Sequence, residues 1–314
     1  MRLVKHVVTC PEYTQLNPKS DYAFKTRICT ETWKKSVKII LMLAFFTIFV
    51  NLPYSHHLFA DGVSKKSYKL PKGFTPLTDD KDTVSGLPLT IRCETDGSEM
   101  ALVPAGEFVM GSDDIGNDES PQHTVYLDAY YIDKYEITNA QFKKFCDNTR
   151  FKYPENPPWD SSYFLSKPDN PVVLIHWHTA QSYLKWAGKR LPTEAEWEKA
   201  ARGVDARLYP WGNDHDLSGC NLDSSKDNFQ YTSPVGTFAN GISPYGCYDM
   251  IGNVTEWCND WHEPDYYKFT VKDNPPGPEE GATKVLRGGS YKDNDEMQCA
   301  RRSEAFPVAA NVNV

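Results

Sequence analysis

The stretch Tyr248–Trp261, with the sequence YDMIGNVTEWCNDW, places two carboxylates and two tryptophans around a Gly-Asn turn. Asp249 precedes the turn and Glu256 follows it. Carboxylates around a bend, with free carbonyls between them, supply the converging oxygens that a hard cation such as Ca²⁺ needs. The alternative is purely structural: Asp249 closes a turn, and Glu256 faces water on a strand that buries Trp257. The rest of the chain bears on this choice.

The charge of the chain is unevenly placed. Its 314 residues carry a net charge of −8. Residues 1–38 hold eight Lys and Arg against three Asp and Glu, a net +5, which leaves −13 for residues 39–314. Such an acidic body, without a basic stripe, argues against nucleic acid as a partner and suits cation binding.

The amino-terminal part has a targeting pattern, in which a basic leader (residues 1–38) precedes the apolar run IILMLAFFTIFV at Ile39–Val50. This run is shorter than the roughly 20 residues of a spanning helix. It matches the hydrophobic region of an export signal, and Ala60 could end a cleavage site. We therefore expect residues 39–60 to be a signal peptide, with a retained membrane anchor as the alternative, and the protein to be exported to the periplasm or the cell exterior.

Residues 61–85 are polar and aperiodic, so they are predicted to be a linker before a domain at 86–314. Two of the eight cysteines lie in the leader, and no CxxC occurs, so neither a zinc ribbon nor a thioredoxin-type site is indicated. The six cysteines of the body are Cys93, Cys146, Cys220, Cys247, Cys258 and Cys299.

The domain begins with strand patterns. Leu102–Val109 is predicted to form two short strands around a Pro-Ala-Gly turn, and Thr124–Ile137 is rich in β-branched and aromatic residues. The acidic segment Gly111–His123 between them is expected to be a solvated loop.

Three helices follow, each with a start signal of the capping type and two with a closing glycine. The first begins at Thr138, the second runs from Thr179 to Gly188, and the third runs from Thr193 to Gly203. After the third helix, Gly, Pro, Asn and Asp punctuate short apolar pieces. Such a loop-dominated half-domain loses conformational entropy that few backbone ladders offset, and bound cations are one way to hold it.

Six segments, in order, resemble the sulfatase-modifying factor family, which comprises the formylglycine-generating enzymes and their paralogues. They are LVPAGEFVMGS (Leu102–Ser112), DKYEITNAQF (Asp133–Phe142), GKRLPTEAEWEKAARG (Gly188–Gly203), YPWGN (Tyr209–Asn213), YDMIGNVTEW (Tyr248–Trp257) and VLRGGSY (Val285–Tyr291). The resemblance implies a C-type-lectin-like α+β fold with much irregular structure. The family usually ends with a further strand that contains Gly-Phe-Arg, and we expect this strand to be missing because the chain stops before it.

The family binds two calcium ions, and the resemblance places both sites on this sequence. Side-chain oxygens and main-chain carbonyls of the kind that Ca²⁺ accepts are present at every position. The first set is Asn221, Leu222, Asp227 and Phe229, and the second is Asp249, Gly252, Val254 and Glu256. Asn253-Val254-Thr255 is also a glycosylation sequon, which we interpret as incidental inside such a turn.

The resemblance does not extend to the copper-binding cysteines of the family. Oxidases of the family carry a cysteine pair soon after the GGSY segment, and two thiolates suit Cu(I). Here Tyr291 is followed by polar and acidic residues, and the next cysteine is Cys299. It aligns with a structural cysteine of the family, and the positions that correspond to its disulfide partner and to a second bridge are Ala201 and Leu184. Cys299 is therefore expected to be an unpaired core thiol, which makes copper doubtful.

These observations predict an exported, calcium-stabilised member of the family without copper oxidase chemistry. A loop-built cleft near Ser290 and Arg302 would bind a peptide or a small ligand. One alternative is an active formylglycine-generating oxidase that converts a sulfatase cysteine with O₂, in which Ser290 would lie near the reacting thiol. A second alternative is a non-haem iron oxygenase, with His176 and His178 on one face of a strand. Whether the protein is an enzyme stays open at this point.

Overall fold

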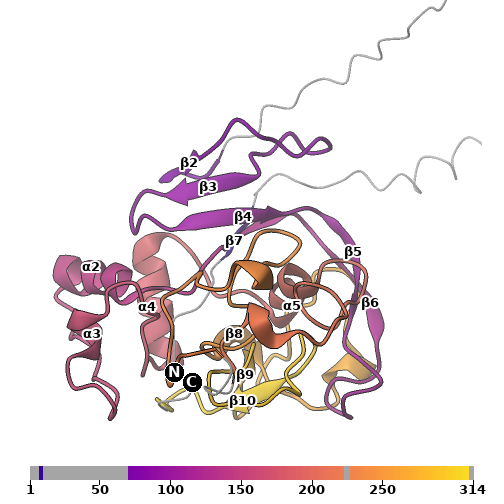
Figure 1. Ribbon diagram of the computed structural model, residues 1–314. Helices are drawn as coiled ribbons and strands as arrows, with labels where there is room; N and C mark the ends of the chain where they lie inside the picture. The colour runs from indigo at the N-terminus through magenta and orange to yellow at the C-terminus, as the bar shows by residue number, and fades with distance from the viewer. Residues whose placement is uncertain (1–6, 10–69, 223–226, 311–314) are drawn as a thin grey trace, which may run out of the picture. The chain divides into compact units, whose positions relative to one another are not determined.

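The computed structural model describes residues 7–9, 70–222 and 227–310 (Figure 1). The largest sheet has five antiparallel strands in the order β1-β7-β4-β3-β2. Its strands are β1 (Val7–Thr9), β2 (Phe74–Pro76), β3 (Thr90–Cys93), β4 (Glu99–Val103) and β7 (Tyr130–Asp133). Strand β2 lies within the predicted linker and β1 within the predicted leader, so the sheet uses residues before the expected boundary at 86.

A two-stranded sheet consists of β5 (Gly106–Met110) and β6 (His123–Leu127). The prediction of two strands around the Pro-Ala-Gly turn is confirmed as β4 and β5. The segment Thr124–Ile137 divides between two sheets instead, because β6 pairs with β5 while β7 pairs with β4. The break falls at Asp128, whose backbone N–H donates to Asn274 Oδ1 at 2.9 Å.

The third sheet has the order β10-β9-β8 and is built from β8 (Glu256–Trp261), β9 (Lys284–Arg287) and β10 (Ser303–Ala305). Between Gly203 and Glu256, the described residues form the short 3-10 helices η1 (Leu217–Gly219) and η2 (Ala239–Gly241) and isolated bridges. A third 3-10 helix, η3, spans Tyr266–Lys268. The predicted loop-dominated half-domain is confirmed.

The α-helices of the described residues are α2 (Asn139–Thr149), α3 (Tyr163–Ser166), α4 (Trp177–Ala187) and α5 (Glu194–Arg202). The capping boxes at Thr138 and Thr193 are confirmed, with Gln141 and Glu196 returning the second bond of each. In the described part of the chain no helix is long and apolar enough to span a membrane. The apolar run at 39–50 lies outside the described residues.

The start of α4 differs from the prediction. The helix begins at Trp177 after His176, which makes no side-chain capping bond, rather than after Thr179. The Trp177 backbone N–H donates to the carbonyl of Pro307 at 3.2 Å. A partner 130 residues away in sequence thus satisfies an amide of the first turn, and no local pattern reports it. The predicted end at Gly188, in the left-handed conformation, is confirmed.

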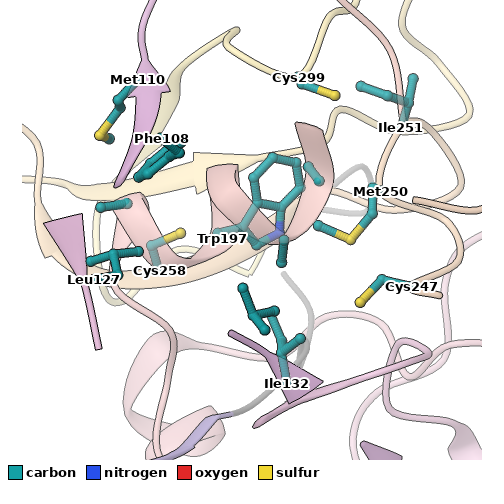
Figure 2. Close-up of a cluster of buried hydrophobic side chains, with 14 of the residues drawn as sticks. Phe108, Met110, Leu127, Ile132, Trp197, Cys247, Met250, Ile251, Cys258 and Cys299 are labelled. Carbon is teal, nitrogen blue, oxygen red and sulfur yellow. The ribbon is translucent and has the colours of Figure 1, made fainter. Parts of the chain in front are cut away.

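Helix α5 lies at the centre of the larger hydrophobic core. It packs against β5, β6, β8 and β9, and Trp197 on it is fully buried. Figure 2 shows the indole of Trp197 among side chains from several elements, including Phe108, Cys258, Met250 and Cys247. A second cluster joins α2 and α4 to Trp257 of β8 and Leu286 of β9. The larger cluster also contains Leu222, Met250 and Ile251, so it packs part of the turn-rich half-domain against regular structure.

Candidate functional site

The first candidate calcium segment is centred on Asn221, which is 1% exposed. Its Nδ2 donates to the carbonyl of Tyr231 at 2.9 Å and to Asn253 Oδ1 at 3.3 Å, which fixes the orientation of the amide. Within the described residues, Asn221 Oδ1 is buried without a hydrogen-bond partner. Burying an amide oxygen without a partner is costly, so this acceptor is expected to bind a water or a cation in solution.

The rest of the first set lies beyond residues 223–226, which are outside the described part of the chain. Asp227 Oδ1 accepts a hydrogen bond from the Phe229 backbone N–H at 2.8 Å and so closes a tight turn between these two candidate ligands. Leu222 is buried in the larger core, which anchors the other end of the segment. The first set therefore has a buried amide oxygen at one end and a carboxylate on a turn at the other.

The second candidate segment is a bend in which three of the five residues from 249 to 253 have positive φ. Asp249, Gly252 and Asn253 have φ values of 54°, 78° and 52°. Asp249 Oδ2 accepts from the Gly236 backbone N–H at 2.7 Å. Glu256, the first residue of β8, accepts from the Trp197 indole N–H through Oε2. These bonds aim both carboxylates inward, where Glu256 is fully buried and Asp249 is 5% exposed.

The two candidate sets are in direct contact. Asn221 and Gly252 form a parallel β-bridge, and the Asn253 backbone N–H donates to the Asn221 carbonyl at 2.9 Å. A Cβ at position 252 would collide with that carbonyl, so the close approach requires glycine. The structure thus brings together residues that lie 31 positions apart in the sequence.

The chemistry of both sets fits calcium. The first set offers amide, carboxylate and main-chain oxygens, the second offers two carboxylates and main-chain oxygens, and neither offers sulfur or nitrogen. Among the described residues, no cluster of three or more His, Cys, Asp or Glu side chains could hold a metal ion. The ligand sets carried over from the family would not form such a cluster, because each combines only one or two carboxylates with neutral oxygens. The observation that supports the fit is the unfilled Asn221 Oδ1.

Sequence reasoning missed the buried polar network that supports these segments. Asn253 is fully buried, and its Nδ2 donates to Glu136 Oε2 at 2.6 Å. Its Oδ1 accepts from the Ser233 backbone N–H at 3.0 Å as well as from Asn221. Glu136 and Asn253 both lie in segments quoted for the resemblance, and a polar residue inside such a segment was the available signal. A buried sequon asparagine also agrees with the sequon being incidental.

The segment after Gly289 forms a closed polar turn. Asp293 Oδ2 accepts from both the backbone N–H and the hydroxyl of Ser290, at 2.7 and 2.9 Å. The Asp293 backbone N–H returns a bond to the Ser290 carbonyl at 2.9 Å. Ser290 is 1% exposed. Its hydroxyl is therefore held by a carboxylate three residues further along the chain.

Cys299 is a free thiol in the larger core, together with Ala201. Burial raises the pKa of Cys299 to about 12, so the thiol stays protonated at neutral pH. All six cysteines of the body are buried. The expectation that Cys299 is an unpaired core thiol is confirmed. Leu184, the other position carried over for a bridge, belongs to the second cluster.

Arg302 belongs to a buried chain of alternating charges. Its guanidinium contacts Glu194 Oε1 at 2.8 Å and Asp118 Oδ1 at 2.8 Å, and its side chain has 0% exposure. Glu194 also pairs with Arg287, which continues to Glu198. Burial opposes the charge of Arg302, but the carboxylate of Glu194 raises its pKa above the ordinary value.

This burial corrects the predicted cleft at Ser290 and Arg302. Both side chains are enclosed, and each has its own hydrogen-bond partners, so neither forms the wall of an open cleft. The segment Gly111–His123 also differs from the expected solvated loop. Its Asp118 contacts Arg302, and Glu119 is 2% exposed. The acidic sequence did not reveal that Asp118 pairs with the buried Arg302 guanidinium and that Glu119 accepts from the Arg302 backbone N–H.

The pair of histidines considered for iron does not lie on a strand. His176 precedes α4 and His178 lies in its first turn, and both side chains are exposed. The helix separates them by two positions, about 200° of rotation, so they do not share a face. The predicted arrangement of two imidazoles on one strand face is wrong.

Comparison with known proteins assigns the chain to a family. The model of the sulfatase-modifying factor enzyme 1-like domain matches residues 89–314. The chain belongs to this family. Formylglycine-generating enzyme of Bos taurus is 34% identical over 280 residues, which cover 69% of this chain and 73% of the relative. A second Bos taurus relative, named inactive C-alpha-formylglycine-generating enzyme 2, is 29% identical over 263 residues, covering 68% of this chain and 82% of the relative.

Other relatives are larger. Serine/threonine-protein kinase pkn1 of Chlamydia pneumoniae is 37% identical over 232 residues, which cover 68% of this chain and 36% of the kinase. The chain thus spans about a third of that relative. Among solved structures, PvdO from Pseudomonas aeruginosa has a TM-score of 0.62 at 27% identity, over 69% of this chain and 92% of PvdO. The sulfatase-modifying-factor fold, mixed α+β with much irregular structure, is therefore established for this chain.

Proposed function

We propose that this protein is a calcium-stabilised, ligand-binding member of the sulfatase-modifying factor family that lacks copper oxidase chemistry. The observation that carries the proposal is the turn after Gly289, where Asp293 holds the Ser290 hydroxyl at 2.9 Å. Two thiolates would be needed there for Cu(I). The sequence has no cysteine between Ser290 and Cys299, and the Cys299 thiol is buried and protonated.

Calcium would act as a structural ion. The side chains of Asn221 and Asp227 with the carbonyls of Leu222 and Phe229 would hold one ion. Asp249, Gly252, Val254 and Glu256 would hold the other. The ions would fix the turn-rich half-domain, whose conformational entropy few backbone ladders offset. Support comes from the all-oxygen donor sets and from the unfilled, buried Asn221 Oδ1.

The alternative is a formylglycine-generating oxidase that acts on a sulfatase cysteine. The identity of 34% to an enzyme of that name favours it. Ser290 is also retained. The relative named as inactive shows that membership of the family does not by itself imply the oxidase activity. The two hypotheses predict different metals, so metal content separates them.

The deciding experiment is a metal analysis of the purified protein combined with an activity assay. We expect calcium and no copper, and no mass change when a CxPxR peptide is incubated with the folded protein, Cu(I) and O₂. Stoichiometric Cu(I) binding together with formylglycine formation would overturn the proposal in favour of the oxidase. Folding is checked on the same preparation by circular dichroism.

The calcium assignment is tested separately by thermal melting. Chelation should lower the melting temperature, and Glu256→Gln should lower it in the same way and remove the part of the chelator response that comes from the second site. At about 100 times Kd, bound calcium contributes about 3 kcal/mol per site. Glu279→Gln, at an exposed glutamate, is the matched control and should behave as the wild type. A melting temperature that neither chelator nor Glu256→Gln changes would refute the site.

Export follows from residues 39–60 and forms part of the proposal. We infer that the chain is directed to the periplasm or the cell exterior, by a cleaved signal or a retained anchor, where millimolar calcium suits weak sites. Mass spectrometry of the amino terminus after expression and cell fractionation tests this. An intact amino terminus in the cytosolic fraction would contradict both forms of export.

A further inference from the structure

A cavity of about 430 Å³ lies beside the first candidate calcium segment. This volume is within the range of about 300–1,000 Å³ that small-molecule sites occupy. Its wall comes from two parts of the chain, residues 159–170, which include α3, and the segment that follows the candidate ligand Asp227. The lining residues are Trp159, Asp160, Tyr163, Lys167, Asn170, Asn228, Phe229, Gln230, Tyr231, Thr232 and Pro234.

Aromatic rings form a rigid platform in this cavity. The rings of Trp159 and Tyr231 stack in parallel, with centroids 4.7 Å apart and an interplanar angle of 7°. Tyr163 meets Trp159 edge-on at 6.5 Å, and Tyr291 meets both stacked rings edge-on at 5.7 and 5.8 Å. Trp159 and Tyr231 remain partly exposed. A preformed, partly exposed stack of this kind offers a flat apolar surface at little cost in side-chain entropy.

The polar groups of the cavity are mostly uncharged. Asn228 and Gln230 are exposed, whereas Asn170 and Thr232 are buried. Asn170 Nδ2 donates to the Thr232 carbonyl at 3.0 Å, which holds the floor in place. Amide and hydroxyl groups both donate and accept hydrogen bonds, so they suit a ligand with many hydroxyls.

The charges of the cavity balance. Asp160 and Lys167 supply one of each sign among the lining residues, and the chain as a whole carries −8. A phosphorylated or sulfated ligand would need more than one cation, and it would meet an acidic protein. The cavity therefore favours a ligand without net charge.

An extended peptide is a poorer fit. Adding a strand requires backbone groups that are ready to pair. The carbonyls of Tyr231 and Thr232 already accept bonds from the side chains of Asn221 and Asn170, at 2.9 and 3.0 Å. These two carbonyls are thus engaged by the protein itself, which favours recognition through side chains.

We propose that this cavity binds a neutral saccharide. The apolar C–H face of a sugar ring packs on the Trp159–Tyr231 stack, and its hydroxyls bond to the amides of Asn228 and Gln230 and to Asp160 and Lys167. This names the ligand class of the proposed ligand-binding function and rests on it. The segment 227–232 supplies both a candidate calcium ligand and the cavity wall, so calcium also orders the site.

The test is calorimetric titration of the full chain with chitotriose, cellotriose, mannotriose and lactose, each with and without calcium. We expect at least one of them to bind with a micromolar to millimolar Kd. Trp159→Ala should weaken that binding by about tenfold, the effect expected from losing one aromatic stacking partner. Gln230→Ala, at an exposed rim position, should also weaken it while leaving the melting temperature unchanged.

Trp211→Ala is the matched control. Trp211 stacks on Tyr209 with centroids 5.1 Å apart and an interplanar angle of 6°, but it is not a lining residue of this cavity. Binding should be unchanged in this variant. The proposal is overturned if none of the four saccharides binds the folded wild type, or if Trp159→Ala and Gln230→Ala leave binding intact. Preferential binding of decaproline or of a sulfated disaccharide would also overturn it.

The experiments distinguish failure of the saccharide proposal from failure of the proposed function. Calcium without copper, together with no saccharide binding, would refute only the ligand class. Conversion of the CxPxR peptide would refute the proposed function, whatever the saccharide titration shows. Both readings come from one preparation of the protein.

Discussion

Asn253 links the two candidate calcium segments, because its backbone N–H donates to the Asn221 carbonyl at 2.9 Å and its Oδ1 accepts from Asn221 Nδ2 at 3.3 Å. A change at one segment is therefore transmitted directly to the other. We expect the two ions to bind with positive coupling, so that filling the first site raises the affinity of the second. Calorimetric titration with Ca²⁺ measures this coupling.

Asn253→Ala should remove that coupling and destabilise the fold by about 1–3 kcal/mol, because it leaves the Ser233 amide and Asn221 Nδ2 short of a buried acceptor. Urea unfolding gives the free energy. Asn240→Ala, at an exposed asparagine of η2, serves as the control and should change neither quantity. Independent binding of the two ions in the wild type would contradict the link.

Arg302 and Arg301 offer a matched comparison of a buried and a partly exposed arginine. Arg302→Ala should destabilise the protein by about 3–5 kcal/mol, since it leaves the carboxylate of Glu194 buried with fewer counter-charges. Arg301→Ala should cost at most about 1 kcal/mol, because its side chain is 31% exposed and its nearest carboxylates lie 3.7 and 4.0 Å away. Urea unfolding of both variants checks the difference, and equal effects would contradict the structural role assigned to Arg302.

The sequence predicted the local parts of this fold well. Capping boxes at Thr138 and Thr193 and the closing glycines at 188 and 203 are signals within a few residues, and each was confirmed. The predicted start of α4 was wrong because the Pro307 carbonyl, which accepts from the first-turn amide, is remote in sequence. The prediction did not separate Thr124–Ile137 into two strands for the same reason, since the choice of a pairing partner for each strand is non-local.

The candidate site shows the same limit. The oxygens of Asn221 and Glu256 could be named from motifs, but their enclosure by Glu136, Ser233 and Trp197 could not. Arg302 was predicted to lie beside a ligand cleft, whereas paired charged residues can be fully buried. Only the fold shows that Glu194 and Asp118 converge on it.

His262 contacts two carboxylates from different parts of the chain, and its contribution to stability depends on pH. Its Nε2 lies 2.9 Å from Asp118 and its Nδ1 lies 3.0 Å from Glu304 of β10, while Arg302 also contacts Asp118. Burial acts to lower the pKa of His262, but the hydrogen bond and charge of Asp118 outweigh it, and the pKa is raised. A raised folded-state pKa stabilises the protein below the ordinary value of 6.5 and loses this contribution as pH rises through the folded-state pKa.

The stability difference between the wild type and His262→Gln should therefore be larger at pH 6 than at pH 9. Urea unfolding across this range measures it. His215→Gln is the control, because His215 is exposed and its Nε2 bonds to the carbonyl of Asp295 rather than to a carboxylate. A difference that stays constant from pH 6 to pH 9 would show that protonation of His262 does not contribute.

The cysteines provide the last prediction. Each of the six thiols of the body is buried, and burial raises the pKa of Cys299, Cys258 and Cys146. The thiolate is the reactive form, so these groups should not react with a disulfide reagent in the native state. In full-length protein with Cys10→Ser and Cys29→Ser, we expect no release of thionitrobenzoate from Ellman's reagent until urea unfolds the chain, and then reaction of the exposed thiols, Cys299, Cys258 and Cys146 among them. Fast reaction of one thiol in the folded protein would identify an accessible thiolate and would restore support for thiol-based metal or redox chemistry.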